Sequence, residues 1–417
     1  MNKSLFGILD RRLLLLIIIG AMLFFYNFKN QVHCGQITGC IDKYWVYFWL
    51  ISFEDGYERR ALLGQIIRLI FGHSIDYLAL NFVAFLMVTI ILFIVYFVYF
   101  NYNFKKNIIP FILILSGPST MVLYETLGDP LQISFLVFIC YALIIINLSN
   151  ALNTLKVIMA LFTTIIVILI HEASIFLYLP VIYLLLCITS NKSPSFTHVT
   201  ILTVFVGVTY SVLFNSQLPT GTSTGLILKD KSMLYVPIDV LPKFSTLIIN
   251  EYYSYFGSLT AFKFFVTKII RVMLWPIVAV LILSRFCQDK TLSKIFYPLL
   301  FLSLPLYAIG HDWGRFCVYT LLVSLFCSAL IFSKKLDFNL EKFCFVKSFM
   351  NNKVYFISNQ NMLYFFPLLY FANSYYRVDG LTNENMVYCI FSISIYIVMN
   401  LQKPSHQFKK TENVNCD

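Results

Sequence analysis

Residues 77–100 have the sequence YLALNFVAFLMVTIILFIVYFVYF, a run of 24 residues without a charged side chain. Because a helix rises about 1.5 Å per residue, this run is long enough to cross the roughly 30 Å hydrocarbon core of a membrane. Similar runs recur along the 417 residues, which are 59% hydrophobic, 12% charged and have a mean hydropathy of +0.78. Soluble domains are less apolar and carry about twice this charge. The sequence therefore predicts an all-α polytopic integral membrane protein.

The same criterion predicts about twelve transmembrane helices along the chain. Several of the runs are shorter than the roughly 20 residues that cross a bilayer comfortably. Runs 156–170 and 173–189 are separated only by His171 and Glu172, which fits either a tight hairpin or one long kinked helix. The predicted spans are 13–28, 77–100, 108–124, 130–148, 156–170, 173–189, 198–214, 268–285, 294–310, 315–333, 361–374 and 385–400.

Basic residues indicate the orientation of these helices, because cytoplasmic loops are enriched in Lys and Arg. With a cytoplasmic N-terminus, the predicted inner segments hold 18 of the 31 basic residues and only six of the 20 acidic ones. We therefore predict cytoplasmic N- and C-termini and two long extracytoplasmic loops, at about 29–76 and 215–267. Residues 1–400 form one predicted bundle and 401–417 a cytoplasmic tail. The net charge of +11 is spread over the loops, so it does not indicate nucleic-acid binding.

Ten cysteines are scattered along the chain. Cys34 and Cys40, in HCGQITGC, can form a disulfide if their loop is extracytoplasmic. A metal site at Cys34 and His33 is an alternative that lacks further ligands nearby. Six cysteines lie in or beside apolar runs, where we expect them to act as small buried hydrophobic residues: Cys140, Cys187, Cys287, Cys317, Cys327 and Cys389.

The densest charge cluster lies in FEDGYERRALLG, residues 53–64, between the first two predicted spans. Glu54 and Asp55 precede Arg59 and Arg60 there. The apolar residues that follow Gly56 broadly form a helical stripe, so the sequence predicts a short amphipathic helix on the outer membrane surface. The competing interpretation is an ordinary start to the second span.

Further ionisable residues fall on the same predicted outer face, at short turns where helix ends bring distant segments together. Such groups are costly at membrane depth, which makes them candidates for a functional site. The competing interpretation is that they are solvated loop residues that cap helices or pair with one another. They are Glu125 and Asp129 in YETLGDP, His171 and Glu172 in LIHEAS, His311, Asp312 and Arg315 in GHDWGRF, and Arg377 and Asp379 in YYRVDG.

The sequence lacks the motifs of several known enzyme classes. LIHEAS does not continue to the second His of the zinc-protease motif, because residue 175 is Ile. The chain has no nucleophile elbow, Walker motif or dinucleotide fingerprint. We therefore predict no cofactor and assign no metal ligands, since carboxylates alone do not define a divalent-metal site.

An outward-facing site with carboxylates, Arg and His suits a substrate that arrives in the membrane on a lipid phosphate. Transfer of a sugar from a polyprenyl diphosphate needs a carboxylate or a His to take the proton of the acceptor hydroxyl. It also needs cationic groups that stabilise the departing diphosphate. A nucleotide-binding domain is not required.

The whole chain resembles the Wzy-type O-antigen and capsule polymerases of bacteria and, more broadly, the GT-C class of membrane glycosyltransferases. The resemblance is one of organisation. It consists of about twelve spans, long outer loops, and the carboxylates Glu54 and Asp55 in the first outer loop, before an apparent interfacial helix. It implies a glycosyltransferase in the bacterial cytoplasmic (inner) membrane that joins lipid-linked oligosaccharide units on the outer face. The implied partners are the lipid-linked glycan, membrane lipids and other polysaccharide-assembly membrane proteins.

The resemblance also implies roles for the candidate residues. Asp55 is the first candidate for the general base and Glu54 is its rival, and His171 and Glu172 complete the catalytic set. The implied diphosphate-binding residues are Arg59, Arg60, His311, Asp312 and Arg315. Two alternatives stay open: a flippase that moves the same glycan, and a membrane acyltransferase that uses His171.

Overall fold

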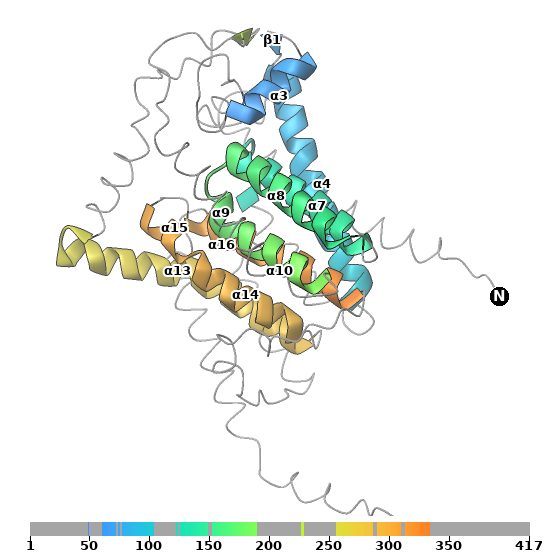
Figure 1. Cartoon of the computed structure of the whole chain (residues 1–417). Helices are drawn as coiled ribbons and strands as arrows, with labels where there is room; N and C mark the ends of the chain where they lie inside the picture. The colour runs from blue at the N-terminus through green and yellow to red at the C-terminus, as the bar shows by residue number, and fades with distance from the viewer. Residues whose placement is uncertain are drawn as a thin grey trace, which may run out of the picture.

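The computed structural model describes residues 49, 61–71, 74–75, 77–103, 122–123, 126–148, 152–189, 227–228, 256–286, 290–309 and 313–333 (Figure 1). These residues are almost all helical. The helices are α3 (Ala61–Phe71), α4 (Tyr77–Asn103), α7 (Pro130–Asn147), α8 (Asn153–Ile170), α9 (Ser174–Leu177), α10 (Leu179–Thr189), α13 (Leu259–Phe286), α14 (Lys290–Leu302), α15 (Leu304–Ile309) and α16 (Trp313–Ser333). Two-residue strands β1 (Ser74–Ile75) and β2 (Ile227–Leu228) pair in parallel.

Helix α16 is the centre of the bundle. Every residue from Trp313 to Ile331 is buried, and α16 packs against α4, α13 and α14. Thr320 and Ser324 satisfy their hydroxyl groups within the helix by donating to the Phe316 and Thr320 carbonyls, at 2.8 and 2.7 Å. Because these hydroxyls donate to carbonyls of their own helix, other helices can surround α16 without leaving the hydroxyls unpaired.

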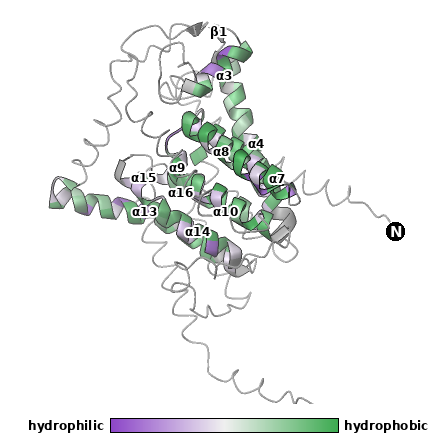
Figure 2. Ribbon diagram, viewed as in Figure 1, coloured by the Kyte–Doolittle hydropathy of each residue, from purple (hydrophilic) through white to green (hydrophobic). Residues whose placement is uncertain are grey.

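Five described helices are long and apolar enough to cross a membrane: α4, α7, α8, α13 and α16. Figure 2 shows hydrophobic residues over most of the bundle, with hydrophilic ones concentrated in parts of α3, α13 and α14. This arrangement supports the predicted all-α membrane protein, since helices satisfy their own backbone hydrogen bonds in lipid.

Seven of the predicted spans coincide with described helices, although their limits differ. α13 begins at Leu259, nine residues before the predicted 268, so residues 259–267 of the predicted outer loop are helical. The run 294–310 is divided into α14 and α15 at Ser303, beside Pro305. Spans 13–28, 108–124, 198–214, 361–374 and 385–400 lie outside the described residues, apart from 122–123. The total of about twelve spans and the cytoplasmic location of both termini stay predictions.

The two runs around His171 form a hairpin rather than one kinked helix. Lys156, at the start of α8, donates from its Nζ to the carbonyl oxygen of Thr189, at the end of α10, over 2.6 Å. This contact requires the chain to reverse between the two helices. The reversal occurs at residues 171–173, where the amide of Ser174 donates to the carbonyl oxygen of His171 at 3.0 Å.

The predicted amphipathic helix after Gly56 is present as α3. Its Leu63 and Ile67 are buried, whereas Leu69 and Ile70 are 77% and 67% exposed. The buried side chains lie in the first two turns of α3, and its last turn carries exposed apolar side chains. Its position on the outer membrane surface stays a prediction.

Aromatic rings join α7, the α9–α10 junction and α16. The ring of Phe135 lies 5.8 Å from that of Tyr178 and 5.9 Å from that of Tyr319. Phe138 lies 5.6 Å from Tyr178 and 6.4 Å from Phe326. Because lipid is as apolar as these side chains, close packing rather than escape from water stabilises such a core.

We therefore expect Phe135→Ala to reduce the free energy of unfolding in mixed detergent micelles by about 3–5 kcal/mol, because it leaves a cavity among the rings. The matched control is Phe82→Ala on α4, where the side chain is 65% exposed and its removal leaves no cavity. Equal losses in the two variants would contradict the packing argument.

Candidate functional site

Three helix ends meet at one end of the bundle: the start of α7, the turn between α8 and α9, and the start of α16. The hydroxyl of Ser134 donates to the carbonyl of Val167 at 3.2 Å, which joins α7 to α8. The hydroxyl of Tyr178 donates to the carbonyl of Leu131 at 3.1 Å, which joins the α9–α10 junction to the start of α7. Helix α9 also packs against α16. We call this end the ionic end.

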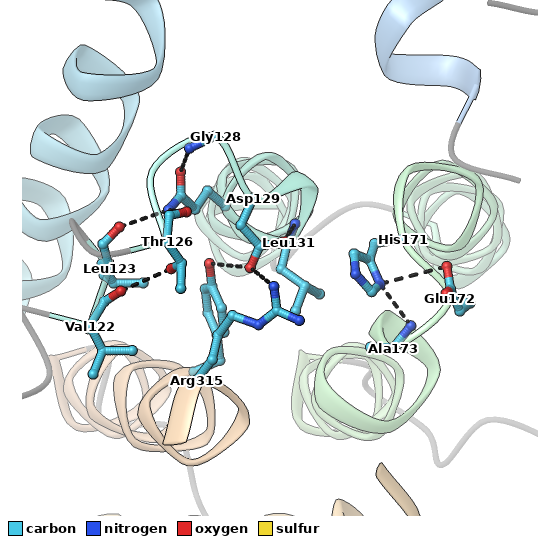
Figure 3. Close-up of polar contacts among 12 residues, drawn as sticks. Val122, Leu123, Thr126, Gly128, Asp129, Leu131, His171, Glu172, Ala173 and Arg315 are labelled. Atoms are coloured by element: carbon cyan, nitrogen blue, oxygen red, sulfur yellow. Dashed lines mark hydrogen bonds and ion pairs between the residues drawn. The ribbon is translucent and has the colours of Figure 1, made fainter. Parts of the chain in front are cut away.

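Asp129 lies at the centre of the ionic end and serves two helices. It is the N-cap of α7, where its Oδ1 accepts a hydrogen bond from the amide of Leu131 at 3.0 Å, and Pro130 begins the helix. Its Oδ2 lies 2.9 Å from Nη1 of Arg315, in the first turn of α16 (Figure 3). The hydroxyl of Tyr319 also donates to Oδ2, at 3.5 Å. Asp129 and Arg315 are 0% and 4% exposed.

The loop before Asp129 is held in place by the amide of Gln132. Its Nε2 donates to the carbonyls of Leu123 and Thr126, at 2.9 and 2.8 Å, and its Oε1 accepts from the amide of Gly128 at 3.3 Å. Gly128 has a φ of 86°, which glycine adopts without a steric penalty. The carbonyl of Gly128 accepts a hydrogen bond from the indole of Trp49. These hydrogen bonds hold the described part of the loop in place next to Asp129.

The ion pair is energetically demanding. Removing two charges from water costs several kcal/mol per ion, by order-of-magnitude estimates, and is offset only when geometry and hydrogen bonding are good. Here the second carboxylate oxygen is satisfied by a helix N-terminus, whose partial positive charge also favours Asp129. Arg315 lies 5.3 Å from the ring of Phe316, which adds a cation–π contact. The pair holds α7 against α16 at a fixed register.

His171 and Glu172 occupy the turn between α8 and α9 at the same end (Figure 3). Nδ1 of His171 accepts a hydrogen bond from the amide of Ala173 at 3.1 Å. This pattern assigns the proton of the neutral ring to Nε2. Oε2 of Glu172 lies 3.7 Å from Nδ1, beyond hydrogen-bond distance, and the Glu172 side chain is 10% exposed against 3% for His171. Of the two, Glu172 is therefore the group better placed to accept a proton from a substrate.

Trp313, the first residue of α16, contacts two aromatic rings and a lysine. Its ring lies 5.2 Å from that of Phe265 on α13 and 6.0 Å from that of Tyr307 on α15. Nζ of Lys268, also on α13, lies 4.8 Å from the centre of the Trp313 ring. Lys268 is therefore a second positive charge near the start of α16, because Trp313 lies only two residues before Arg315.

The structure describes three of the predicted site residues: His171, Glu172 and Arg315. The other six, Glu54, Asp55, Arg59, Arg60, His311 and Asp312, lie outside the described residues. The roles of all nine stay predictions. Sequence reasoning did not foresee that Asp129 pairs with Arg315, although an Asp directly before a Pro is a signal for a helix start.

The described part of the chain holds no group of three or more His, Cys, Asp and Glu residues that is arranged to bind a metal. The described cysteines are free. Cys317 and Cys327 are buried, as predicted, whereas Cys187 is half-buried and Cys140 is exposed. Cys34, Cys40, Cys287 and Cys389 lie outside the described residues.

Comparison with known proteins gave no match to a protein-family model, to a curated protein or to a solved structure.

The geometry of the ion pair leads to a double-mutant prediction. Asp129→Asn keeps a residue that caps helices well but removes the charge, so we expect a loss of about 3–5 kcal/mol in the free energy of unfolding, because Arg315 is left buried without its counter-ion. Arg315→Met should cost a similar amount. The double variant should lose less than the sum, with a coupling energy of about 0.5–3 kcal/mol in detergent denaturation.

The control cycle pairs Arg315→Met with Lys156→Met, which lies at the far end of α8. These two changes should be additive to within about 0.5 kcal/mol. Additivity in the Asp129–Arg315 cycle as well would contradict a direct interaction between the two charges.

Proposed function

We propose that this chain is a glycosyltransferase of the bacterial cytoplasmic membrane that polymerises or transfers oligosaccharide units carried on a polyprenyl diphosphate. The reaction belongs to the outer face of the membrane, in the assembly of O-antigen, capsule or exopolysaccharide. Its substrate is a lipid-linked glycan, and its partners are membrane lipids and the other membrane proteins of polysaccharide assembly. The resemblance in organisation to the Wzy-type and GT-C proteins supports this proposal.

The single observation that carries the proposal is the ionic end of the bundle. Asp129, His171, Glu172 and Arg315 are all buried there, at the ends of helices that are otherwise apolar. A polyprenyl diphosphate places its charged head at such a level, because its chain stays in hydrocarbon while the diphosphate requires a polar surrounding. Charged side chains at membrane depth are costly and are typical of substrate sites.

The proposed reaction is a substitution at the anomeric carbon of the donor sugar. The acceptor hydroxyl forms the new C–O bond, the bond to the diphosphate breaks, and the diphosphate leaves with the electron pair. A carboxylate takes the proton of the hydroxyl. Among the described residues Glu172 is the group best suited to this step, because the Ala173 amide occupies Nδ1 of His171. Asp55 and Glu54 stay the candidates from the first outer loop.

The charge that develops on the leaving diphosphate must be stabilised by cations. Arg315 already faces Asp129, so its contribution to a bound diphosphate is reduced by the neighbouring carboxylate. In the proposal the Asp129–Arg315 pair therefore mainly positions α7 and α16, and Arg59, Arg60 and His311 supply the remaining positive charge, with Asp312 orienting them.

We expect Glu172→Gln to reduce polymer formation at least tenfold while the protein accumulates normally, because loss of a general base typically costs 10²–10⁴-fold, on the order of 3–5 kcal/mol. The measurement is the chain length of the surface glycan in a deletion strain complemented with each variant. Glu412→Gln in the predicted cytoplasmic tail is the matched control and should restore full-length polymer.

The same strains separate transfer from transport. If the chain is a transferase, the deletion strain still exposes a single repeat unit at the cell surface. A flippase would leave none there. Absence of that unit, or normal polymer from Glu172→Gln together with normal polymer from Asp55→Asn, would refute the proposed function.

A further inference from the structure

The first half of α13 differs in character from the second. Residues 256–271, FGSLTAFKFFVTKIIR, contain Lys263, Lys268 and Arg271 and no acidic residue. Beyond Arg271 the helix is largely buried against α14 and α16, with Val272, Val280 and Leu283 at 0% exposure. We call residues 256–271 the basic segment. Residues 256–267 fall in the predicted outer loop, and from Leu259 onwards the segment is part of the long helix α13.

The basic segment carries cations and exposed apolar side chains together. With about 100° between successive residues, Lys263, Thr267 and Arg271 follow one another on one face of the helix, and Lys268 lies next to Arg271 on the edge of that face. Leu259 and Ile270 lie on the same face, one turn before and two turns after Lys263, and Phe262 lies on the opposite side; their side chains are 71%, 50% and 45% exposed. The cations are therefore interspersed with apolar side chains that are largely uncovered.

The basic segment reaches past the ionic end. Lys268 contacts Trp313 at the start of α16, and Phe265 packs edge-on against the same ring. The turns before Lys268 therefore extend beyond the level at which α16 begins. Figure 1 shows this directly, as the yellow start of α13 projects past α15 and α16.

Neither water nor hydrocarbon suits this segment. Exposed Phe and Leu side chains are unfavourable in water, and three cations are unfavourable in hydrocarbon. The boundary between the membrane and water accommodates both, because the Phe, Leu and Ile side chains lie among acyl chains while the long Lys and Arg side chains extend to the headgroups.

We propose that the basic segment binds the phosphate groups of anionic phospholipids at the membrane surface, with Lys263, Lys268 and Arg271 as the headgroup-binding residues. The occupant is a phospholipid rather than a free phosphate, because the cations share their helical turns with the uncovered apolar side chains. This site is separate from the proposed donor site. Through Lys268 and Trp313 it anchors the start of α16 to the lipid surface.

Photo-crosslinking of the full-length protein in nanodiscs tests this proposal. A p-benzoyl-phenylalanine at position 264, where the native Phe is 60% exposed, reports which lipid lies beside the cations. The nanodiscs contain phosphatidylcholine with a minor share of phosphatidylglycerol. We expect phosphatidylglycerol to be enriched among the crosslinked lipids by about fivefold or more over its bulk share, given the attraction of each basic residue to anionic lipid.

The triple variant K263Q/K268Q/R271Q should return the crosslinked lipids to the bulk ratio. The matched control R285Q/K290Q/K294Q removes the same charge from the other end of α13 and from α14, and should keep the enrichment. If the triple variant fails to fold, Lys263→Gln alone, at an exposed position, should still lower the enrichment measurably.

Three results would overturn the proposal. The first is crosslinking at the bulk lipid ratio in the native chain, and the second is crosslinking to a protein, including a second copy of this chain, in place of lipid. The third is complete loss of enrichment when inorganic pyrophosphate is added at constant ionic strength, which would indicate a site for a soluble phosphate. Retained enrichment in the presence of pyrophosphate supports the phospholipid.

Discussion

The pairing of Asp129 with Arg315 is the constraint on which the arrangement of the bundle depends. Two opposite charges inside a helical bundle are stable only when they face each other, so the start of α7 and the start of α16 cannot move apart independently. Asp129 is fixed in turn by the amide of Leu131 and by the loop that Gln132 holds together. This polar contact thus links the start of the central helix to the start of α7.

The apolar surface is nevertheless what fills the space. Rings from α7, from the α9–α10 junction and from α16 pack around Phe135 and Phe138, stacked or edge-on. Tyr178 and Tyr319 belong to both layers, because their rings stack in the core while their hydroxyls donate to Leu131 and Asp129. These two tyrosines couple the packing of the core to the geometry of the ionic end. A substitution in the aromatic core is therefore expected to alter the hydrogen bonds to Leu131 and Asp129.

Much of the helical architecture followed from hydropathy alone. Apolar runs such as 77–100 and 315–333 have few alternatives to a buried helix, and the structure contains them. The hairpin at His171 was one of two interpretations, because the decisive contact between Lys156 and Thr189 joins residues 33 positions apart. The pairing of Asp129 with Arg315 spans still more sequence. A single sequence identifies charged residues, but not which of them face one another.

Which atoms of a candidate residue can accept a proton depends on three-dimensional contacts that the spacing of residues in the sequence does not predict. From the sequence, His171 is the candidate that assists proton transfer, and Glu172 is the residue that orients it. The backbone amide of Ala173 argues against that assignment, because it occupies the Nδ1 lone pair with which His171 would accept a proton. The tight turn between α8 and α9 brings that amide close. For the proposed reaction, the fold of the hairpin therefore favours the carboxylate of Glu172, because the turn that ends α8 occupies Nδ1 of His171.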